Sequence, residues 1–153
     1  MDTNFAVFTD TRDNLIIEND GFYPDMSLEG LTDRFAIDRD IKQSLLVSFI
    51  KLAMSRCNTA LKTSKRQWLN KGLTTLAEVN PNETLDNQTE SEILYTNAVY
   101  FAAYAEICSA QDRSQRNLVE AEERLDRAAI YQQKSAYALG QLSGNGKIQV
   151  RLL

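Results

Sequence analysis

The amino-acid sequence predicts a mainly α fold: a bundle of three long helices plus one short helix, with an extended N-terminal arm and a C-terminal β-strand. Apolar residues recur at three- and four-residue steps along three long stretches, as they do on one face of a helix. The last seven residues alternate between apolar and polar side chains, as in a strand. The 153 residues suit one domain, which we divide into the arm (1–26), a helical domain (27–146) and the strand (147–153).

The arm contains two short apolar runs, residues 5–8 and 15–17, which are bounded by acidic and turn residues. This pattern is typical of a mobile or strand-forming segment. After the arm, Ser27 is a candidate N-cap for the short helix, which is predicted to end near Phe35. Asp38 is a candidate N-cap for the first long helix.

The first long helix is predicted to extend to Gly72, because glycine favours a helix stop at this position. Arg56 interrupts its apolar stripe, which otherwise comprises Ile41, Leu45, Phe49, Leu52, Cys57, Ala60 and Leu61. The last turns of this helix, around Trp68, carry the cations Lys62, Lys65, Arg66 and Lys71. Positive charges suit the negative end of the helix dipole.

Residues 73–88 are predicted to form a loop with a turn at Asn80-Pro81-Asn82. The second long helix should start near Thr89, because the run from Thr89 to Glu92 resembles a capping box. From 93 to 110 this helix is apolar nearly all round. It should therefore be covered on most sides, either by its own chain or by neighbouring subunits.

A third long helix follows the polar residues 112–116 and ends at the turn residues 143–146. Its predicted apolar face consists of Leu118, Ala121, Leu125, Ala128, Ala136, Leu139 and Leu142. The strand after it places Ile148, Val150 and Leu152 on one side, flanked by Lys147 and Arg151. A lone terminal strand needs a partner, because its backbone groups would otherwise stay unmatched. The partner is either the N-terminal segments of its own chain or a sheet edge on a neighbouring chain.

Composition excludes several function classes. A net charge of −4 and a sequence pI of about 4.9 argue against a general polyanion binder. The absence of histidine removes Ser-His-Asp and Cys-His catalysis and His-ligated zinc, so we expect no enzyme, no metal and no cofactor. The two cysteines lack a CxxC spacing and are interpreted as buried, reduced thiols. Acidic residues near the N-terminus argue against a signal peptide. No apolar run is long enough to span a membrane, so we expect no membrane contact.

Three clusters have both a structural and a functional interpretation. The cations around Trp68 favour a solvated helix end whose indole ring packs on the core. The alternatives are contact with a partner protein and contact with nucleic acid. Four carboxylates on the third helix favour a solvated face over a catalytic or metal site: Glu120, Glu122, Glu123 and Asp126. The second long helix carries tyrosines that belong either to the core or to a subunit interface: Tyr95, Tyr100 and Tyr104.

The order of these features resembles the head completion proteins of contractile-tailed phages from about Phe22 to Leu153. No piece is specific alone, and the ordered set carries the resemblance. In chain order the pieces are Phe22-Tyr23-Pro24-Asp25, Asn58 and Leu61 in a long helix closed by Gly72, Leu76, Tyr95 with Ala98-Val99, Asp112, Leu142, Gly144, and the Ile148–Val150 strand. Two features depart from the family: residues 106–110 lack its arginine-rich helix end, and residues 1–21 match nothing in it.

The resemblance implies a structural virion protein, assembled in the host cytoplasm, that forms a homo-oligomeric ring of about twelve copies beneath the portal. Its implied partners are the portal protein and neck or tail completion proteins, and DNA would pass through the lumen without specific binding. Lys147, Ile148, Val150, Arg151 and Leu152 are the candidate residues for docking to the portal or a neighbouring subunit. The candidate subunit-interface residues are Lys62, Lys65, Arg66, Trp68, Tyr95, Tyr100 and Tyr104. The rival hypothesis is a small helical nucleic-acid-binding module that uses residues 62–71.

Overall fold

The computed structural model describes residues 14–82, 84–112 and 118–144, and it confirms a mainly helical protein. The helices are α1 (Leu28–Arg34), α2 (Gln43–Ala60), α3 (Lys62–Asn70), the 3-10 helix η2 (Leu76–Glu78), α4 (Glu90–Asp112) and α5 (Leu118–Ser143). The strands are β1 (Ile16–Ile17), β2 (Met26–Ser27), β3 (Thr84–Leu85) and β4 (Gln88–Thr89). The predicted C-terminal strand and the apolar run 5–8 lie outside the described residues.

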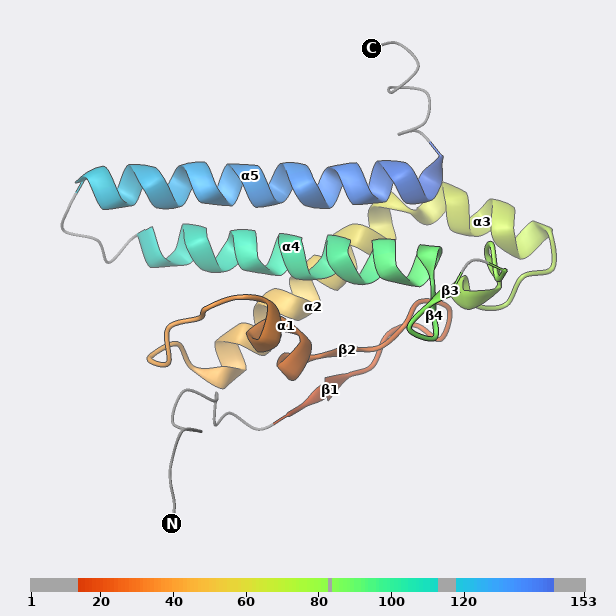
Figure 1. The fold of residues 1–153 in the computed structure, drawn as a ribbon, viewed down its shortest axis with the longest axis horizontal. Helices are drawn as coiled ribbons and strands as arrows, with labels where there is room; N and C mark the ends of the chain where they lie inside the picture. Colours follow the sequence, from red (N-terminus) through yellow and green to blue (C-terminus); the bar gives the residue numbers. More distant parts are fainter. Residues whose placement is uncertain (1–13, 83, 113–117, 145–153) are drawn as a thin grey trace, which may run out of the picture.

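Helix α4 is the centre of the fold (Figure 1). Helix α5 lies antiparallel to it on one side, and α2 crosses it on the other side. The β1–β2 hairpin and α1 lie on the same side of α4 as α2 (Figure 1). Because α4 is enclosed between these two layers, Tyr95, Ala98, Val99, Ala103 and Ile107 are all buried. The expected cover on most sides of this helix is therefore supplied largely by its own chain.

The N-terminal segment enters the fold as a short antiparallel ladder, in which Ile17 pairs with Met26. Both of these side chains are buried. Immediately after the ladder, the Ser27 hydroxyl accepts a hydrogen bond from the Gly30 N–H at 2.9 Å, which confirms Ser27 as the N-cap of α1. Helix α1 ends at Arg34, close to the predicted end at Phe35.

The first long helix is two helices, which corrects the prediction of one continuous helix. The break lies at Leu61, whose φ of −95° and ψ of 7° leave the helical region. Helix α2 starts at Gln43, and Asp38 is not its N-cap, since its side-chain oxygen accepts the Asp40 N–H at 2.9 Å instead. The predicted stop at Gly72 is confirmed by its φ of +88°, which glycine adopts without steric cost.

The segment 73–88 has more structure than the predicted loop. It contains η2 and a two-residue turn at Asp86 and Asn87 that joins β3 to β4. Both turn residues have positive φ values, 51° and 63°. The predicted capping box at the start of α4 is confirmed. The Thr89 hydroxyl accepts the Glu92 N–H at 3.2 Å, and the Glu92 carboxylate accepts the Thr89 N–H at 3.0 Å.

The buried faces of α2 and α5 agree with the predicted ones only in part: Cys57 on α2 and Ala128 and Leu142 on α5 are buried as predicted. Helix α2 buries Leu46, Ile50, Ala53, Met54 and Cys57, whereas Leu45 and Leu52 of the predicted stripe are exposed. Helix α5 buries Ala128, Ser135, Ala138 and Leu142, whereas Leu125 and Ala136 of its predicted face are exposed. The reason is close packing of α5 on α4: the Ser135 hydroxyl donates a hydrogen bond to the Ala98 carbonyl at 2.7 Å.

Candidate interaction surfaces

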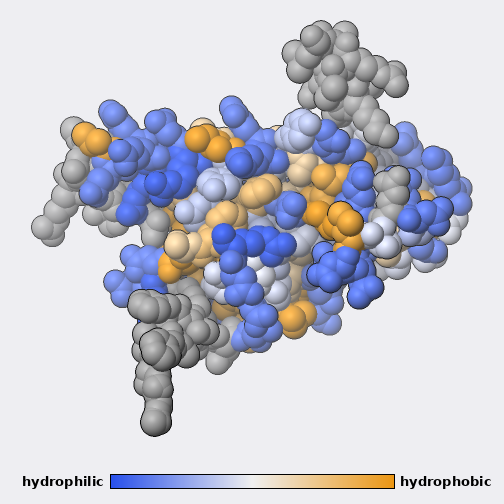
Figure 2. Space-filling model, in the orientation of Figure 1, coloured by the Kyte–Doolittle hydropathy of each residue, from blue (hydrophilic) through white to orange (hydrophobic). Residues whose placement is uncertain are grey.

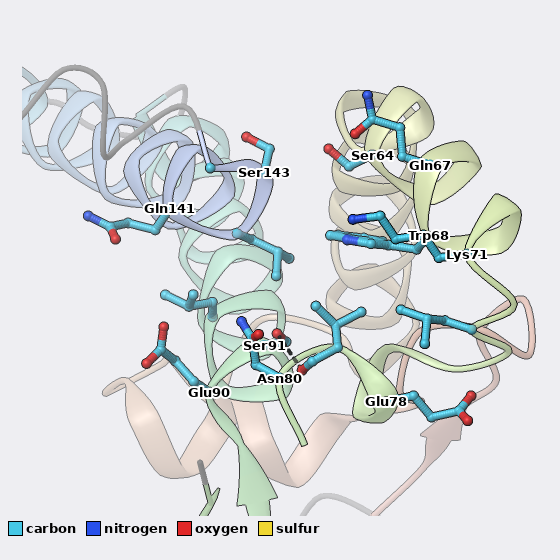
Figure 3. Close-up of a pocket in the computed structure, with 15 residues that line it drawn as sticks. Ser64, Gln67, Trp68, Lys71, Glu78, Asn80, Glu90, Ser91, Gln141 and Ser143 are labelled. Atoms are coloured by element: carbon cyan, nitrogen blue, oxygen red, sulfur yellow. Dashed lines mark hydrogen bonds between the residues drawn. The ribbon is translucent and has the colours of Figure 1, made fainter. Parts of the chain in front are cut away.

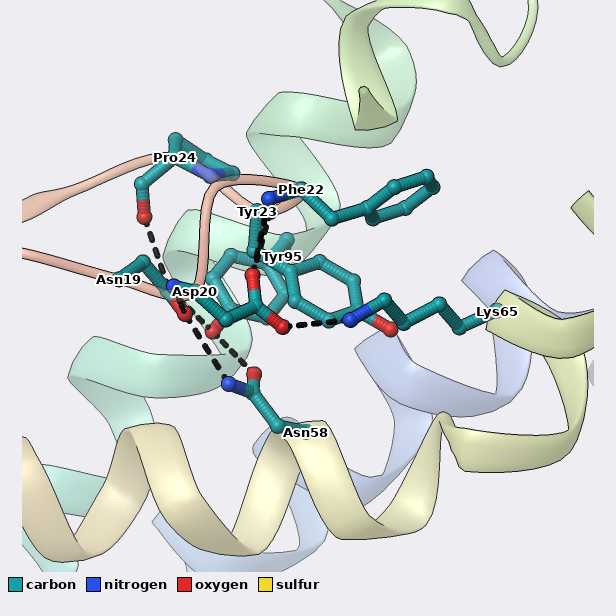
Figure 4. Close-up of polar contacts among 8 residues, drawn as sticks. All are labelled: Asn19, Asp20, Phe22, Tyr23, Pro24, Asn58, Lys65 and Tyr95. Atoms are coloured by element: carbon teal, nitrogen blue, oxygen red, sulfur yellow. Dashed lines mark hydrogen bonds and ion pairs between the residues drawn. The ribbon is translucent and has the colours of Figure 1, made fainter. Parts of the chain in front are cut away.

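The loop between β1 and β2 is fixed to three helices by a polar network (Figure 4). The Tyr95 hydroxyl donates to the Asn58 side-chain oxygen at 2.5 Å and accepts from the Asn19 amide at 2.8 Å. The Asn58 amide donates to the Asn19 side-chain oxygen at 3.0 Å, which closes the ring of contacts. Burial raises the pKa of Tyr95, so its hydroxyl stays protonated and able to donate. This network occupies Tyr95 inside the fold.

Two residues of the basic segment also hold this loop. Lys65 of α3 forms an ion pair with Asp20 at 2.7 Å (Figure 4). Burial acts to raise the pKa of Asp20, but the Lys65 hydrogen bond and the N–H groups of Tyr23 and Phe22 outweigh it and lower that pKa. The Trp68 ring stacks on Phe22 with a centroid separation of 5.9 Å. Lys65 and Trp68 are therefore structural residues of this fold.

Tyr95 and Tyr100 are corrected from interface candidates to core residues, because their own chain leaves them 0% and 3% exposed. The Tyr100 hydroxyl accepts the Ser27 N–H at 3.0 Å and donates to the Ser27 carbonyl at 3.1 Å. Tyr104 is half-buried and stacks on Phe35, with their ring centroids 4.1 Å apart. It retains surface that a neighbouring subunit could contact.

The remaining predicted residues fall into two groups. Lys62 and Arg66 are exposed on α3, and the four clustered carboxylates are exposed on α5. The predicted docking residues Lys147, Ile148, Val150, Arg151 and Leu152 lie outside the described residues. Their segment follows Gly144, which lines a cavity of about 300 Å³.

This cavity, the Trp68 cavity, lies where α3, the segment after η2 and the ends of α4 and α5 meet (Figure 3). Trp68 and Lys71 border it on the α3 side, and Gln141 and Ser143 border it on the α5 side. The Ser91 hydroxyl donates to the Val79 carbonyl at 3.1 Å and fixes the floor between α4 and the loop.

Two further grooves run along α5, one on each side of its contact with α4. The first, the Tyr137 groove, has a volume of about 460 Å³ and is lined by Leu94, Asn97, Phe101, Ile130, Gln133, Lys134, Tyr137 and Ala138. Ile130 is 50% exposed and Tyr137 is 57% exposed. Figure 2 shows hydrophobic surface over α4 and α5, surrounded by hydrophilic residues.

The second groove, the Ala136 groove, lies between α2, α4 and α5 and has a volume of about 290 Å³. It is lined by Arg56, Cys57, Ala60, Ala102, Glu106, Gln132, Ser135, Ala136 and Leu139. The Arg56–Glu106 ion pair connects α2 to α4 within its lining. Sequence periodicity did not reveal either groove, because each is built from more than one helix.

The charged side chains that line the two grooves are Arg56, Glu106 and Lys134. Among the described residues, no three His, Cys, Asp or Glu side chains lie close enough together to hold a metal ion. Burial raises the pKa of Cys57 to about 12, so at neutral pH this groove residue is a protonated thiol rather than a nucleophilic thiolate. Within the described ranges, no helix has the length and apolar character needed to cross a membrane. The grooves are suited to protein contact.

Comparison with known families gives one match: the family model described as "Phage head completion protein (GPL)" matches residues 17–153. The match includes every described helix and strand except the first residue of β1. It confirms the resemblance found in the sequence. Comparisons with curated proteins and with solved structures found no match.

Proposed function

Because the chain belongs to the family of phage head completion proteins, we propose that it is a connector adaptor beneath the portal. In this role it joins the DNA-filled head to the neck or tail proteins. The family match over residues 17–153 is the observation that carries the proposal. The family is structural, so the protein acts through assembly rather than through catalysis.

A ring of about twelve copies fits this position, because it would share the symmetry of the portal above it. Each copy must then contact two neighbours. The two apolar grooves along α5 offer surface for such contacts, and monomeric proteins rarely leave large connected apolar areas open to water. The exposed leucines of α2, Leu45 and Leu52, add to this surface.

The charge of the chain fits a channel through which DNA passes. A net charge of −4 repels phosphate groups at long range, so a ring of such chains would not hold DNA tightly. The rival hypothesis of a nucleic-acid-binding module that uses residues 62–71 is weakened at two of its side chains, whereas Lys62, Arg66 and Lys71 are exposed. Lys65 pairs with Asp20, and Trp68 stacks on Phe22.

The test is a reconstruction of the neck from intact virions. We expect a closed ring of this chain directly below the portal, with about twelve copies if it follows the portal's symmetry. Heads made in cells that lack the protein should carry the portal without this ring, and they should fail to join tails. A complete neck without density for this chain would contradict the proposal.

A further inference from the structure

We propose that neighbouring copies pack head-to-tail, with the Tyr137 groove of one copy against the Ala136 groove of the next. The occupant of each groove is thus a second copy of this chain. This inference rests on the proposed ring and assigns the surfaces that form it.

The two grooves are different surfaces on opposite flanks of one helix. Helix α4 contributes Phe101 to the Tyr137 groove and the next residue, Ala102, to the Ala136 groove. A two-fold dimer uses the same patch twice, whereas a ring joins one patch of each copy to a different patch of its neighbour. Two unlike apolar grooves on opposite flanks match the second arrangement.

The shapes of the two grooves are complementary. Ile130 and Tyr137 are large side chains with at least half of their surface exposed, so they can act as knobs. The opposite groove contains Ala60, Ala102 and Ala136, whose short side chains leave a hollow of about 290 Å³. Burying a large aromatic side chain in such a hollow is the pattern of residues that dominate protein interfaces.

Charge and size also permit this contact. Lys134 is the only charged residue that lines the described Tyr137 groove. In the Ala136 groove, the charges of Arg56 and Glu106 neutralise each other in an ion pair. The two surfaces therefore do not repel each other. The 26 residues of α5 span about 39 Å, and two adjacent helices are roughly 20 Å wide. Such a face provides at most about 800 Å², which is one partner's share of a standard interface, and the two grooves occupy the part of it at residues 130–139 of α5.

Disulfide trapping tests the inference in assembled heads. Infected cells would supply the variant Ala60→Cys/Tyr137→Cys in place of the natural protein, with Cys57→Ala included so that the Ala136 groove holds no native thiol. Cys57→Val replaces Cys57→Ala if the latter is not incorporated. After mild oxidation of purified heads, we expect a ladder of disulfide-linked oligomers on a non-reducing gel.

Three controls, all in the Cys57→Ala background, make the result specific. Each single variant, Ala60→Cys or Tyr137→Cys, should stay monomeric, because a head-to-tail contact never brings identical residues together. The double variant Lys51→Cys/Tyr137→Cys should also stay monomeric, since Lys51 is exposed on α2 but does not line the groove. Ile130→Cys in place of Tyr137→Cys repeats the test if loss of the tyrosine weakens incorporation.

Several outcomes would overturn the inference without touching the proposed function. Heads that contain the double variant but give no ladder would show that the grooves do not face each other. Dimers of the single Tyr137→Cys variant would indicate a two-fold contact, and a crosslink to another protein would indicate that the portal or a neck protein covers this groove. Failure of the proposed function has its own signature, the missing ring in the neck reconstruction.

Discussion

Single hydroxyl and amide groups fix the position of the N-terminal segment on the helices. Tyr95 and Tyr100 each direct a hydroxyl from α4 to this segment, one to Asn19 and one to Ser27. Neither contact is visible in a single sequence, because the partners are 76 and 73 residues apart. The sequence alone leaves both tyrosines between core and interface, and the long-range hydrogen bonds assign them to the core.

Substitution of Gly30 should show how closely Tyr100 packs. A Cβ atom added at Gly30 would lie 2.1 Å from the Tyr100 hydroxyl oxygen and 2.6 Å from its ring. A helical glycine-to-alanine change usually stabilises by about 0.5–1 kcal/mol, but overpacking of this kind costs about 1–3 kcal/mol. We expect Gly30→Ala to lower the free energy of unfolding, measured by urea denaturation. The exposed α1 change Asp33→Ala is the control, and a Gly30→Ala protein more stable than the wild type would refute this reasoning.

Helix ends were predictable from sequence, because their signals are local. Ser27, Gly72 and the Thr89–Glu92 box lie within a few residues of the groups that they cap. The break at Leu61 was missed, since no proline or glycine marks it. The Asp86-Asn87 turn was also missed, although both residue types tolerate positive φ and could have indicated it.

The buried faces of α2 and α5 were not predictable in the same way. Each helix carries two apolar stripes, and periodicity alone does not decide which of them the chain itself covers. On α5 the buried face contains Ala128, Ser135 and Ala138, whose small side chains give a weak hydropathy signal but permit close helix contact. The predicted face shares Ala128 and Leu142 with this buried face, but it also contains Leu125, which is exposed, and Ala136 and Leu139, which line the Ala136 groove.

The start of α4 offers a test at the scale of one element. Thr89→Ala removes the hydroxyl that accepts the Glu92 N–H and should lower the free energy of unfolding by about 1 kcal/mol. Thr89→Ser is the matched control, because both changes remove the methyl group and only serine keeps the capping oxygen. Equal urea midpoints for the two variants would show that the capping hydrogen bond contributes nothing measurable.

At the scale of the whole molecule, the described chain forms a closed core around α4 and leaves apolar surface along the outer helix α5. The core accounts for folding, and the surface along α5 is where we propose that a neighbouring copy binds. The family could be predicted from the ordered sequence features, because their order reflects this architecture. The two grooves along α5 could not be predicted, since a groove arises only when residues distant in sequence come together.

The C-terminal segment provides the last prediction. Within the described residues, β1 pairs with β2 and β3 pairs with β4, and the core cluster includes Leu142. Residues 147–153 alternate as a strand that can add to a sheet edge of the portal or a neighbouring copy, with several backbone hydrogen bonds of about 0.5–1.5 kcal/mol each. Deleting residues 147–153 should leave the helical circular dichroism signal unchanged and abolish incorporation into heads.

A full-length control separates the strand's side chains from its length. The triple change Ile148→Ala, Val150→Ala and Leu152→Ala keeps the backbone donors and acceptors but removes the side chains that would fill pockets on the partner. We expect it to reduce incorporation into heads less than the deletion does, because the ladder of backbone hydrogen bonds can still form. An unfolded truncated protein would assign the segment to the chain's own core, and normal incorporation of the truncated protein would exclude a docking role.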